Sequence, residues 1–351
     1  MGPSVEAVRT ALREVVFPKF RRDVVTLGMV SEIGISGGTV TVELRPGSDD
    51  PEVRTALEAG VLAAVRRLPG AENVVVRMAE ASAGRGQSPF AERAEVPGVR
   101  SVVAVASGKG GVGKSTVAAN LAVALAGQGL RVGLLDADVY GPSVPTMFGT
   151  SVRPRGHAGG RIEPVSAHGV RLMSVGFFLD EGSPVIWRGP LVMGIVRQFL
   201  RDVDWGVLDH LVVDLPPGTG DAPLTLAQQV PLSGGIVVTT PQDVSLLDVG
   251  RGLAMLEQLS VPVLGVVENM AGYACPSCGH VEAVFGEDGA ARLAAHFSVP
   301  LLARLPLDPV VCEQGDRGTP VVLAQPEHPV ADAFRRLAAR VAGELERRAG
   351  C

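Results

Sequence analysis

The sequence feature that most constrains the fold is the run GKGGVGKST at residues 108–116. It fits G-x-x-x-x-G-K-[ST], the pattern of loops that surround phosphate groups with backbone N–H donors. The preceding residues, Val99–Ser107, have the composition of a buried strand, and residues 117–130 favour a helix. Because a strand, a glycine-rich loop and a helix are the context in which this pattern binds nucleotide, we expect a nucleotide site here.

The residues of this run have separate expected tasks. We expect the phosphates to be bound by Gly108, Lys109, Gly110, Gly111, Val112, Gly113, Lys114, Ser115 and Thr116. Lys114 would bring a compact charge to the outer phosphates, and the hydroxyl of Ser115 would hold Mg²⁺. Only three lysines occur in the chain, and two of them lie in this run. Since the flat guanidinium of arginine is a poor substitute for an ammonium here, the use of lysine favours a nucleotide site.

Lys109 lies five residues before Lys114, where most phosphate loops need no second cation. We predict that its side chain reaches an ATP bound to a second subunit. It would then supply a charge in trans that stabilises the transition state of phosphoryl transfer.

Three acids follow predicted strands. The strand at residues 210–214 ends at Asp214, where a carboxylate would hold Mg²⁺ directly or through water; a helix cap is the alternative. Asp136 and Asp138 lie in a segment rich in Gly and Pro, which can change shape when a γ-phosphate leaves. One of this pair would orient the attacking water, and we assign that task to Asp138. Two solvated turn acids are the alternative.

The apolar runs after residue 98 alternate with helical patterns and predict a doubly wound, mostly parallel α/β sheet. The expected strands are 99–107, 131–138, 169–178, 210–214, 235–240, 261–268 and 301–305. Ligands bind such sheets beyond the carboxyl ends of the strands. Lys114, Asp138, Asp214 and Asn269 all fall at these ends, so we expect one site there.

The beginning of the chain predicts a smaller α+β domain. Its expected order is a helix capped by Ser4, strands at 24–35 and 39–45, a helix begun by Pro51, and a strand at 73–78. Residues 80–97 lack an apolar period, which indicates a flexible linker. The predicted organisation is an α+β domain at 1–79, a linker at 80–97 and a phosphate-loop domain at 98–351.

Cys275-Pro-Ser-Cys278 places two thiols at a spacing that chelates soft metals, and His280 follows closely. A complete zinc ribbon would have a second C-x-x-C, and the chain has none. A two-fold dimer that brings two such pairs face to face would supply four thiolates. Four thiolates suit zinc or a [4Fe–4S] cluster. A redox dithiol and a pair of unliganded buried thiols are the other interpretations.

Composition excludes several classes of function. A formal charge of -5 gives no reason to expect nucleic acid or an anionic membrane as a partner. No run approaches the ~18 to 20 apolar residues that a membrane-spanning helix needs. Early acids and the absence of a continuous apolar core also argue against a signal peptide, so we expect a cytoplasmic protein.

Five segments together closely resemble the Mrp/ApbC iron–sulfur carrier ATPases, of the MinD-like group with a deviant phosphate loop. They are GKGGVGKST, DADVYGPS, PVIWRGP at 184–190, DLPPGTGD at 214–221, and ENM followed by CPSCG. The resemblance covers about residues 98–345. It implies a homodimer that binds and hydrolyses ATP. It also implies a labile [4Fe–4S] cluster, bridged by Cys275 and Cys278 of both subunits, which assembly scaffolds load and apo-proteins receive.

The same resemblance implies roles by motif position. Lys109 is the signature lysine and Lys114 the phosphate lysine, and Ser115 is the Mg²⁺ ligand. The first switch contains Asp138 and the second contains Asp214. Asn269 falls where the family contacts adenine.

The first 80 residues resemble the PaaD-like domain that often precedes these carriers, notably in DVVTLGMV at 23–30. That domain commonly has a cysteine after its second strand, whereas this chain has RPGSDDPEV at 45–53. Docking of a partner is therefore the expected role. A MinD-like ATPase that positions itself at a membrane or filament is the alternative for the whole chain. A nitrogenase-type reductase ranks lower, because those enzymes use single, well-separated cysteines.

Overall fold

The computed structural model describes residues 2–15, 23–25, 29–36, 38–44, 51–71, 73–78, 95–139, 141–156, 160–178, 189–218 and 232–349. The chain divides into two compact units, Met1–Ala91 and Glu92–Cys351. The predicted linker at 80–97 lies outside the described residues except for its last three. Of those three, Val96 is 4% exposed and packs in the core of the larger unit.

The smaller unit has the predicted order of elements. They are α1 Val5–Leu12, β1 Val30–Ser36, β2 Thr39–Leu44, α2 Pro51–Val65 and β3 Asn73–Met78. β2 is the central strand, antiparallel to β1 and parallel to β3. Its alternate residues Val40, Val42 and Leu44 are buried with apolar residues of both helices.

The start of the first strand in the smaller unit was predicted wrongly. The strand expected at 24–35 begins at Val30. Val24 and Val25 lie in a turn instead, where Asp23 Oδ1 accepts a hydrogen bond from the N–H of Val25 at 3.1 Å. The prediction failed here because Val24 is apolar and buried, as a strand residue would be, although its backbone lies in a turn.

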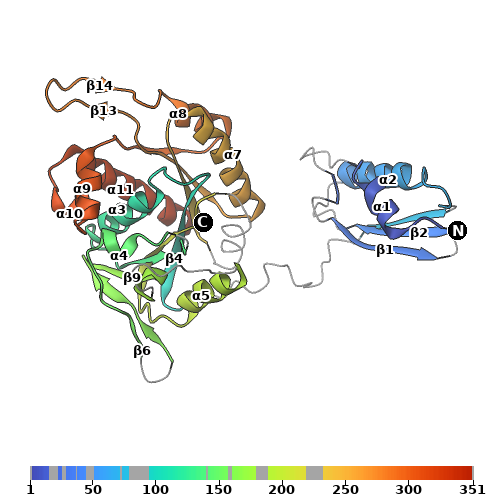
Figure 1. The fold of residues 1–351 in the computed structure, drawn as a ribbon, viewed down its shortest axis with the longest axis horizontal. Helices are drawn as coiled ribbons and strands as arrows, with labels where there is room; N and C mark the ends of the chain where they lie inside the picture. The colour runs from blue at the N-terminus through green and yellow to red at the C-terminus, as the bar shows by residue number, and fades with distance from the viewer. Residues whose placement is uncertain are drawn as a thin grey trace. The chain divides into compact units, whose positions relative to one another are not determined.

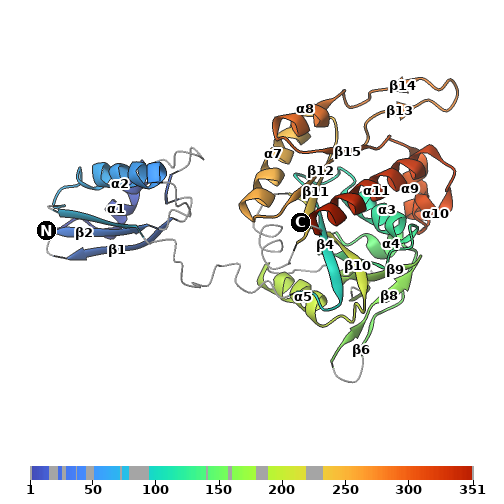
Figure 2. The same cartoon turned by 180° about the vertical axis from the view of Figure 1, so that it is seen from behind.

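The larger unit is the predicted doubly wound sheet, with helices on both faces (Figures 1 and 2). Its strands run in the order β15-β12-β11-β4-β10-β5-β9-β8, all parallel except the edge strand β8. Their bounds are β4 Val99–Ser107, β5 Val132–Asp136, β8 Val165–Ala167, β9 Val170–Ser174, β10 Leu208–Asp214, β11 Gly234–Thr239, β12 Val263–Glu268 and β15 Leu301–Arg304. Short pairs outside this sheet are β6 Arg155–Gly156 with β7 Ile162–Glu163, and β13 Tyr273–Ala274 with β14 Val281–Glu282.

Two separate apolar layers cover the sheet. The helices are α3 Lys114–Ala126, α4 Val144–Met147, α5 Gly189–Arg201, α7 Asp243–Gln258, α8 Gly289–His296, α9 Pro309–Asp316, α10 Val321–Ala324 and α11 Pro329–Ala349, with a 3₁₀ helix at Val175–Phe178. One layer joins α3, α4, α10 and α11 to one face, and the other joins α5, α7 and α8 to the opposite face. The alternation of side chains along β4 explains this: Val103 and Val105 belong to the first layer, and Val102 and Ala104 to the second.

Most strand centres in this unit match the prediction, while several ends differ. The strand expected at 131–138 ends at Asp136, and the one expected at 169–178 ends at Ser174 before the 3₁₀ turn. The helix expected at 117–130 starts three residues earlier, at Lys114, and ends at Ala126. None of the described helices combines the length and apolar character needed to cross a bilayer.

Candidate functional site

The candidate site lies at the carboxyl edge of the sheet, where three neighbouring strands end. The run at 108–116 follows β4 directly, and β10 lies between β4 and β5. Asp214, the last residue of β10, pairs in register with Val105 on one side and with Asp136 on the other. Parallel pairing therefore brings the phosphate loop and the acids together from distant parts of the sequence.

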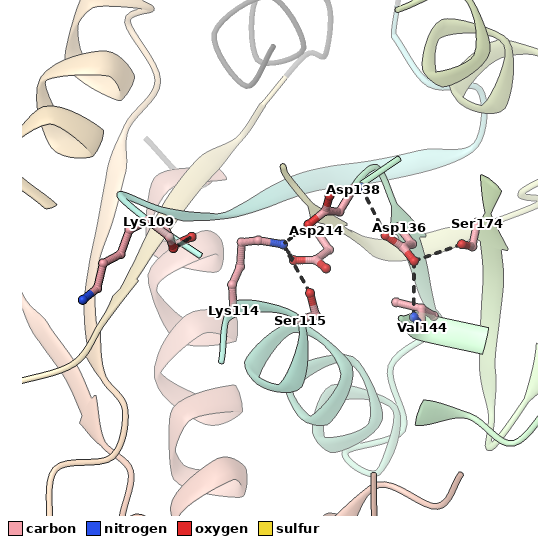
Figure 3. A network of polar contacts seen from close by, with 9 residues as sticks. Lys109, Lys114, Ser115, Asp136, Asp138, Val144, Ser174 and Asp214 are labelled. Carbon is pink, nitrogen blue, oxygen red and sulfur yellow. Dashed lines mark hydrogen bonds and ion pairs between the residues drawn. The ribbon is translucent and has the colours of Figure 1, made fainter. Parts of the chain in front are cut away.

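Lys114 begins α3, and its ammonium points into the acidic cluster (Figure 3). Nζ lies 2.6 Å from Asp214 Oδ1 and 3.7 Å from Asp138 Oδ2. It is also 3.3 Å from Ser115 Oγ. The side chain of Lys114 is 5% exposed and that of Asp214 is 0% exposed, so this ion pair is shielded from solvent.

Asp136 lies behind this pair and is held by three donors. Its Oδ1 accepts from the N–H of Asp138 at 3.1 Å. Its Oδ2 accepts from Ser174 Oγ at 2.9 Å and from the N–H of Val144 at 3.3 Å. Asp136 thus positions the segment that carries Asp138 and the start of α4.

The cluster contains more buried carboxylate than one lysine can neutralise. Burial, with the neighbouring Asp214 charge, raises the pKa of Asp136 to about 7. Burial also raises the pKa of Asp214, even though Lys114 acts in the opposite direction. In the described part of the chain, Asp138 Oδ1 and Asp214 Oδ2 are buried without a hydrogen-bond partner. Unpartnered carboxylate oxygens beside a hydroxyl are the ligands Mg²⁺ prefers, so the donor set fits that ion.

The phosphate loop is shaped by glycine at its last turn. Gly113 has φ +81°, and a Cβ added there would overlap the side-chain nitrogen of Asn269. Asn269 follows β12, and its Nδ2 donates to the carbonyl of Val112 at 2.9 Å. The structure therefore places Asn269 against the loop itself, a contact that the sequence did not indicate.

Lys109 points away from Lys114 and from the acids (Figure 3). Its Nζ donates to Gln242 Oε1 at 3.3 Å, and Gln242 is the N-cap residue of α7. The side chain is half-buried and contributes nothing to the acidic cluster of its own chain. Gln242 and Ser174 are site residues that the sequence analysis missed. Gln242 follows the buried strand β11 and Ser174 ends the buried strand β9, and these positions are the signal that could have identified them.

The two cysteines of C-x-x-C lie in the turn of the β13–β14 hairpin, which projects from the larger unit (Figures 1 and 2). The N–H of Cys275 donates to the carbonyl of His280, and the N–H of Gly279 donates to that of Cys275, both at 2.8 Å. Cys275 and Cys278 are free thiols. The backbone N–H groups of Cys278 and Ser277 lower the pKa of Cys275, because they stabilise the thiolate.

The hairpin supplies only part of a metal site. Among the described residues, no group of three or more His, Cys, Asp and Glu side chains is placed to hold a metal ion. His280 pairs with Glu282 Oε2 at 3.3 Å on the exposed side of the hairpin. One chain thus offers two thiols, half of what a tetrahedral thiolate site requires.

Of the predicted site residues, the structure gathers Lys114, Ser115, Asp138 and Asp214, with Asn269 beside the loop. Lys109 points away from this group, and the two cysteines lie in the separate β13–β14 hairpin. The segment at 184–190 and residues 219–221 of the segment at 214–221 lie outside the described residues, apart from 189–190.

Comparisons with known proteins agree on one kind of protein. The family model described as "NUBPL iron-transfer P-loop NTPase" matches residues 98–342. A second, described as "Iron-sulfur cluster assembly protein", matches residues 5–77. The iron–sulfur cluster carrier protein of Synechocystis sp. is 45% identical over 97% of this chain and 98% of its own length.

Solved structures give the same result for the larger unit. A nucleotide-binding protein from Archaeoglobus fulgidus, in complex with ADP and with cobalt found in it, is 39% identical. It matches with a TM-score of 0.60 over 71% of this chain and 98% of that one. The septum site-determining protein MinD from Pyrococcus horikoshii, complexed with Mg-ADP, is 26% identical. It matches with a TM-score of 0.52 over 69% of this chain and 96% of that one.

Proposed function

This chain belongs to the iron-transfer P-loop NTPases, the family of the iron–sulfur cluster carrier proteins, and we propose that it builds its cluster site between two copies of itself. The protein is an ATPase of the ParA and MinD fold. The proposed cargo is a labile [4Fe–4S] cluster held by Cys275 and Cys278 of both subunits. An assembly scaffold would load it, and apo-proteins would receive it.

The observation that carries this proposal is the incomplete thiol site. The hairpin presents two free cysteines, one with its pKa lowered toward the thiolate, and no third ligand accompanies them among the described residues. A two-fold axis would bring a second pair and complete four thiolates. Free thiols also fit a reducing compartment, so we propose that the protein works in the cytoplasm.

Anaerobic reconstitution tests the cluster site. The protein with iron and sulfide should bind about four irons per dimer and give the broad visible absorption of a [4Fe–4S] cluster. The double variant Cys275→Ser with Cys278→Ser should lose this iron and absorption. Cys312→Ser is the matched control, because Cys312 is an exposed cysteine on α9 and should not matter. Equal iron in the double variant and in the wild type would refute the site.

The nucleotide site is proposed to work with Mg²⁺. Ser115 Oγ and Asp214 would hold the ion, which would neutralise the phosphate charge, and Asp138 would orient the attacking water. Binding of nucleotide must draw Lys114 from Asp214 toward the phosphates. A contact of Asn269 with adenine would use its amide oxygen or the second N–H of its amide nitrogen, because one N–H donates to Val112. Lys114→Ala and Asp138→Asn should each lower ATP turnover by at least about a hundredfold.

Lys109 is proposed to act in trans, and a mixing experiment tests this. Lys109→Ala and Lys114→Ala are each expected to be inactive alone. In a mixed dimer, the protomer with an intact Lys114 receives Lys109 from its partner. Half the dimers are mixed and one of their two sites is complete, so turnover should recover to about a quarter of wild type. No recovery, with mixed dimers confirmed by mass, would show that Lys109 acts within its own chain.

The N-terminal unit is proposed to dock a partner protein. It has its own apolar core and no cysteine. A chain that begins at Glu92 should keep ATP hydrolysis and iron binding while it transfers cluster to a recipient more slowly. Unchanged transfer would refute a docking role.

A further inference from the structure

A short segment joins the phosphate loop to the thiol hairpin. Cys275 lies six residues after Asn269, whose side chain touches the loop. The backbone of Asn269 is itself anchored, because its N–H donates to the carbonyl of Thr239 at the end of β11 (2.7 Å). One residue thus contacts the loop with its side chain and begins the path to the cysteines with its backbone.

The contact at the loop is directional. A carbonyl oxygen only accepts hydrogen bonds, so the amide of Asn269 must present its nitrogen to Val112. Val112 is 2% exposed, and Gly113 next to it has no room for a Cβ against that same nitrogen. The loop therefore cannot turn at Val112 without breaking this bond or moving Asn269.

The backbone between Asn269 and the hairpin is constrained by its conformation and by hydrogen bonds. Met270 has φ +58°, a left-handed backbone conformation that costs a residue with a side chain free energy. The N–H of Ala271 donates to Leu305 at 2.9 Å, and the N–H of Leu307 donates to Gly272 at 2.8 Å. The strand β13 and Cys275 follow directly.

We propose that Asn269 is a positioning residue that couples the state of the phosphate loop to the geometry of the Cys275–Cys278 hairpin. This inference rests on the proposed carrier function. When phosphate binds, the loop N–H groups turn toward it, the Val112 carbonyl turns with them, and Asn269 follows. The segment from Met270 to Gly272 passes that movement to the two thiols.

The measured quantity is a coupling factor. It is the dissociation constant of a fluorescent ATP analogue with cluster-loaded protein, divided by that with metal-free protein, both under anaerobic conditions. Wild type should give a factor that departs from one by at least about fivefold. The same factor must appear in iron binding with and without nucleotide, because coupling in binding free energy is reciprocal. If Asn269 only contacted adenine, its replacement would change both dissociation constants by the same ratio and leave the coupling factor unchanged.

Three variants probe the path. Asn269→Asp keeps the size of the side chain but sets an oxygen against the Val112 carbonyl, and Asn269→Ala removes the contact. Both should bring the factor within about twofold of one. Met270→Gly relieves the left-handed strain and loosens the path. It should keep the nucleotide affinity of metal-free protein while it lowers the factor.

Asn120→Ala is the matched control. Its Nδ2 also donates to a carbonyl of the run at 108–116, that of Thr116 at 3.0 Å, but Asn120 lies within α3. This variant should keep the wild-type factor. A second readout needs no cluster: in metal-free wild type, ATP should change the alkylation rate of Cys275, and in the Asn269 variants it should not.

The outcomes separate the two proposals. A wild-type factor of one refutes this inference but not the proposed function, because loss of iron in the Cys275 and Cys278 variants tests the cluster site separately. A wild-type factor that persists in Asn269→Asp and Asn269→Ala refutes the role of Asn269 alone. If the Asn269 variants do not fold, a wild-type factor in Met270→Gly refutes the path.

Discussion

Replacing Lys114 by methionine should make the nucleotide-free protein strongly and pH-dependently unstable. The substitution keeps most of the side-chain volume and removes the one ammonium that, among the described residues, faces the acidic cluster. Nζ is 2.6 Å from Asp214 and 3.7 Å from Asp138, and all three side chains are at most 11% exposed. Removing one partner of such a buried pair costs about 3 to 5 kcal/mol of unfolding free energy. We expect a loss in that range at pH 8.

The pH dependence has a definite sign. Burial already raises the pKa of Asp136 to about 7 and raises that of Asp214, and Lys114 lowers both. Without Lys114 these folded-state pKa values rise further above the unfolded value of about 4. An acid with a raised folded pKa contributes stability that is fully present below its unfolded pKa and is lost as pH rises through its folded pKa. The gap between variant and wild type should therefore be small at pH 5 and grow toward pH 8.

Urea unfolding followed by tryptophan fluorescence measures this gap. Both tryptophans of the chain belong to the larger unit, and Trp205 is 1% exposed, so the signal reports that unit. Lys109→Met is the control, because this half-buried lysine has one weak contact to Gln242 and should change stability by no more than about 0.5 kcal/mol. The electrostatic reasoning is wrong if Lys114→Met matches wild type at pH 8, or if the gap widens as pH falls.

Three further predictions concern packing, the loop and the thiols. Phe334→Ala, on α11 at 1% exposure, should cost about 3 to 5 kcal/mol in the same urea assay; a loss under about 1 kcal/mol would contradict the packing described. Gly113→Ala should abolish ATP binding in calorimetry, because of its φ of +81° and the overlap with a neighbouring side chain. Gly127→Ala, at φ −62°, should retain binding. At pH 7 iodoacetamide should modify Cys275 faster than Cys312 by peptide mass spectrometry, because its lowered pKa gives more thiolate, and equal rates would count against that shift.

Local pattern explains why much of the larger unit could be predicted. The strand Val99–Ser107 has the predicted bounds, since a continuous apolar run before a glycine loop has few other readings. The small unit shows where local pattern fails. Val24 is buried and apolar, yet it lies in a turn, because burial records packing rather than backbone conformation. The ends of strands were predicted less accurately than their centres for a similar reason. Hydrogen-bond pairing with the neighbouring strand, and not composition, decides where a strand ends.

The candidate site was predictable as a set of residues and not as an arrangement. Strand and loop positions identified Lys114, Ser115, Asp138 and Asp214. The pairing of Lys114 with Asp214, 100 residues away, follows from β10 lying between β4 and β5. The contacts of Asn269 with Val112 and of Lys109 with Gln242 likewise come from the order of strands across the sheet.

The sequence alone determined that a phosphate loop follows a buried strand, that the sheet is mostly parallel and doubly wound, and that one chain has only one C-x-x-C. These are properties of short segments, fixed by residue type and spacing. Only the tertiary structure decided which acid meets Lys114, that Lys109 turns away from its own site, and that the loop touches the segment leading to the cysteines. Those contacts join residues up to 157 positions apart, and strand order and packing bring them together.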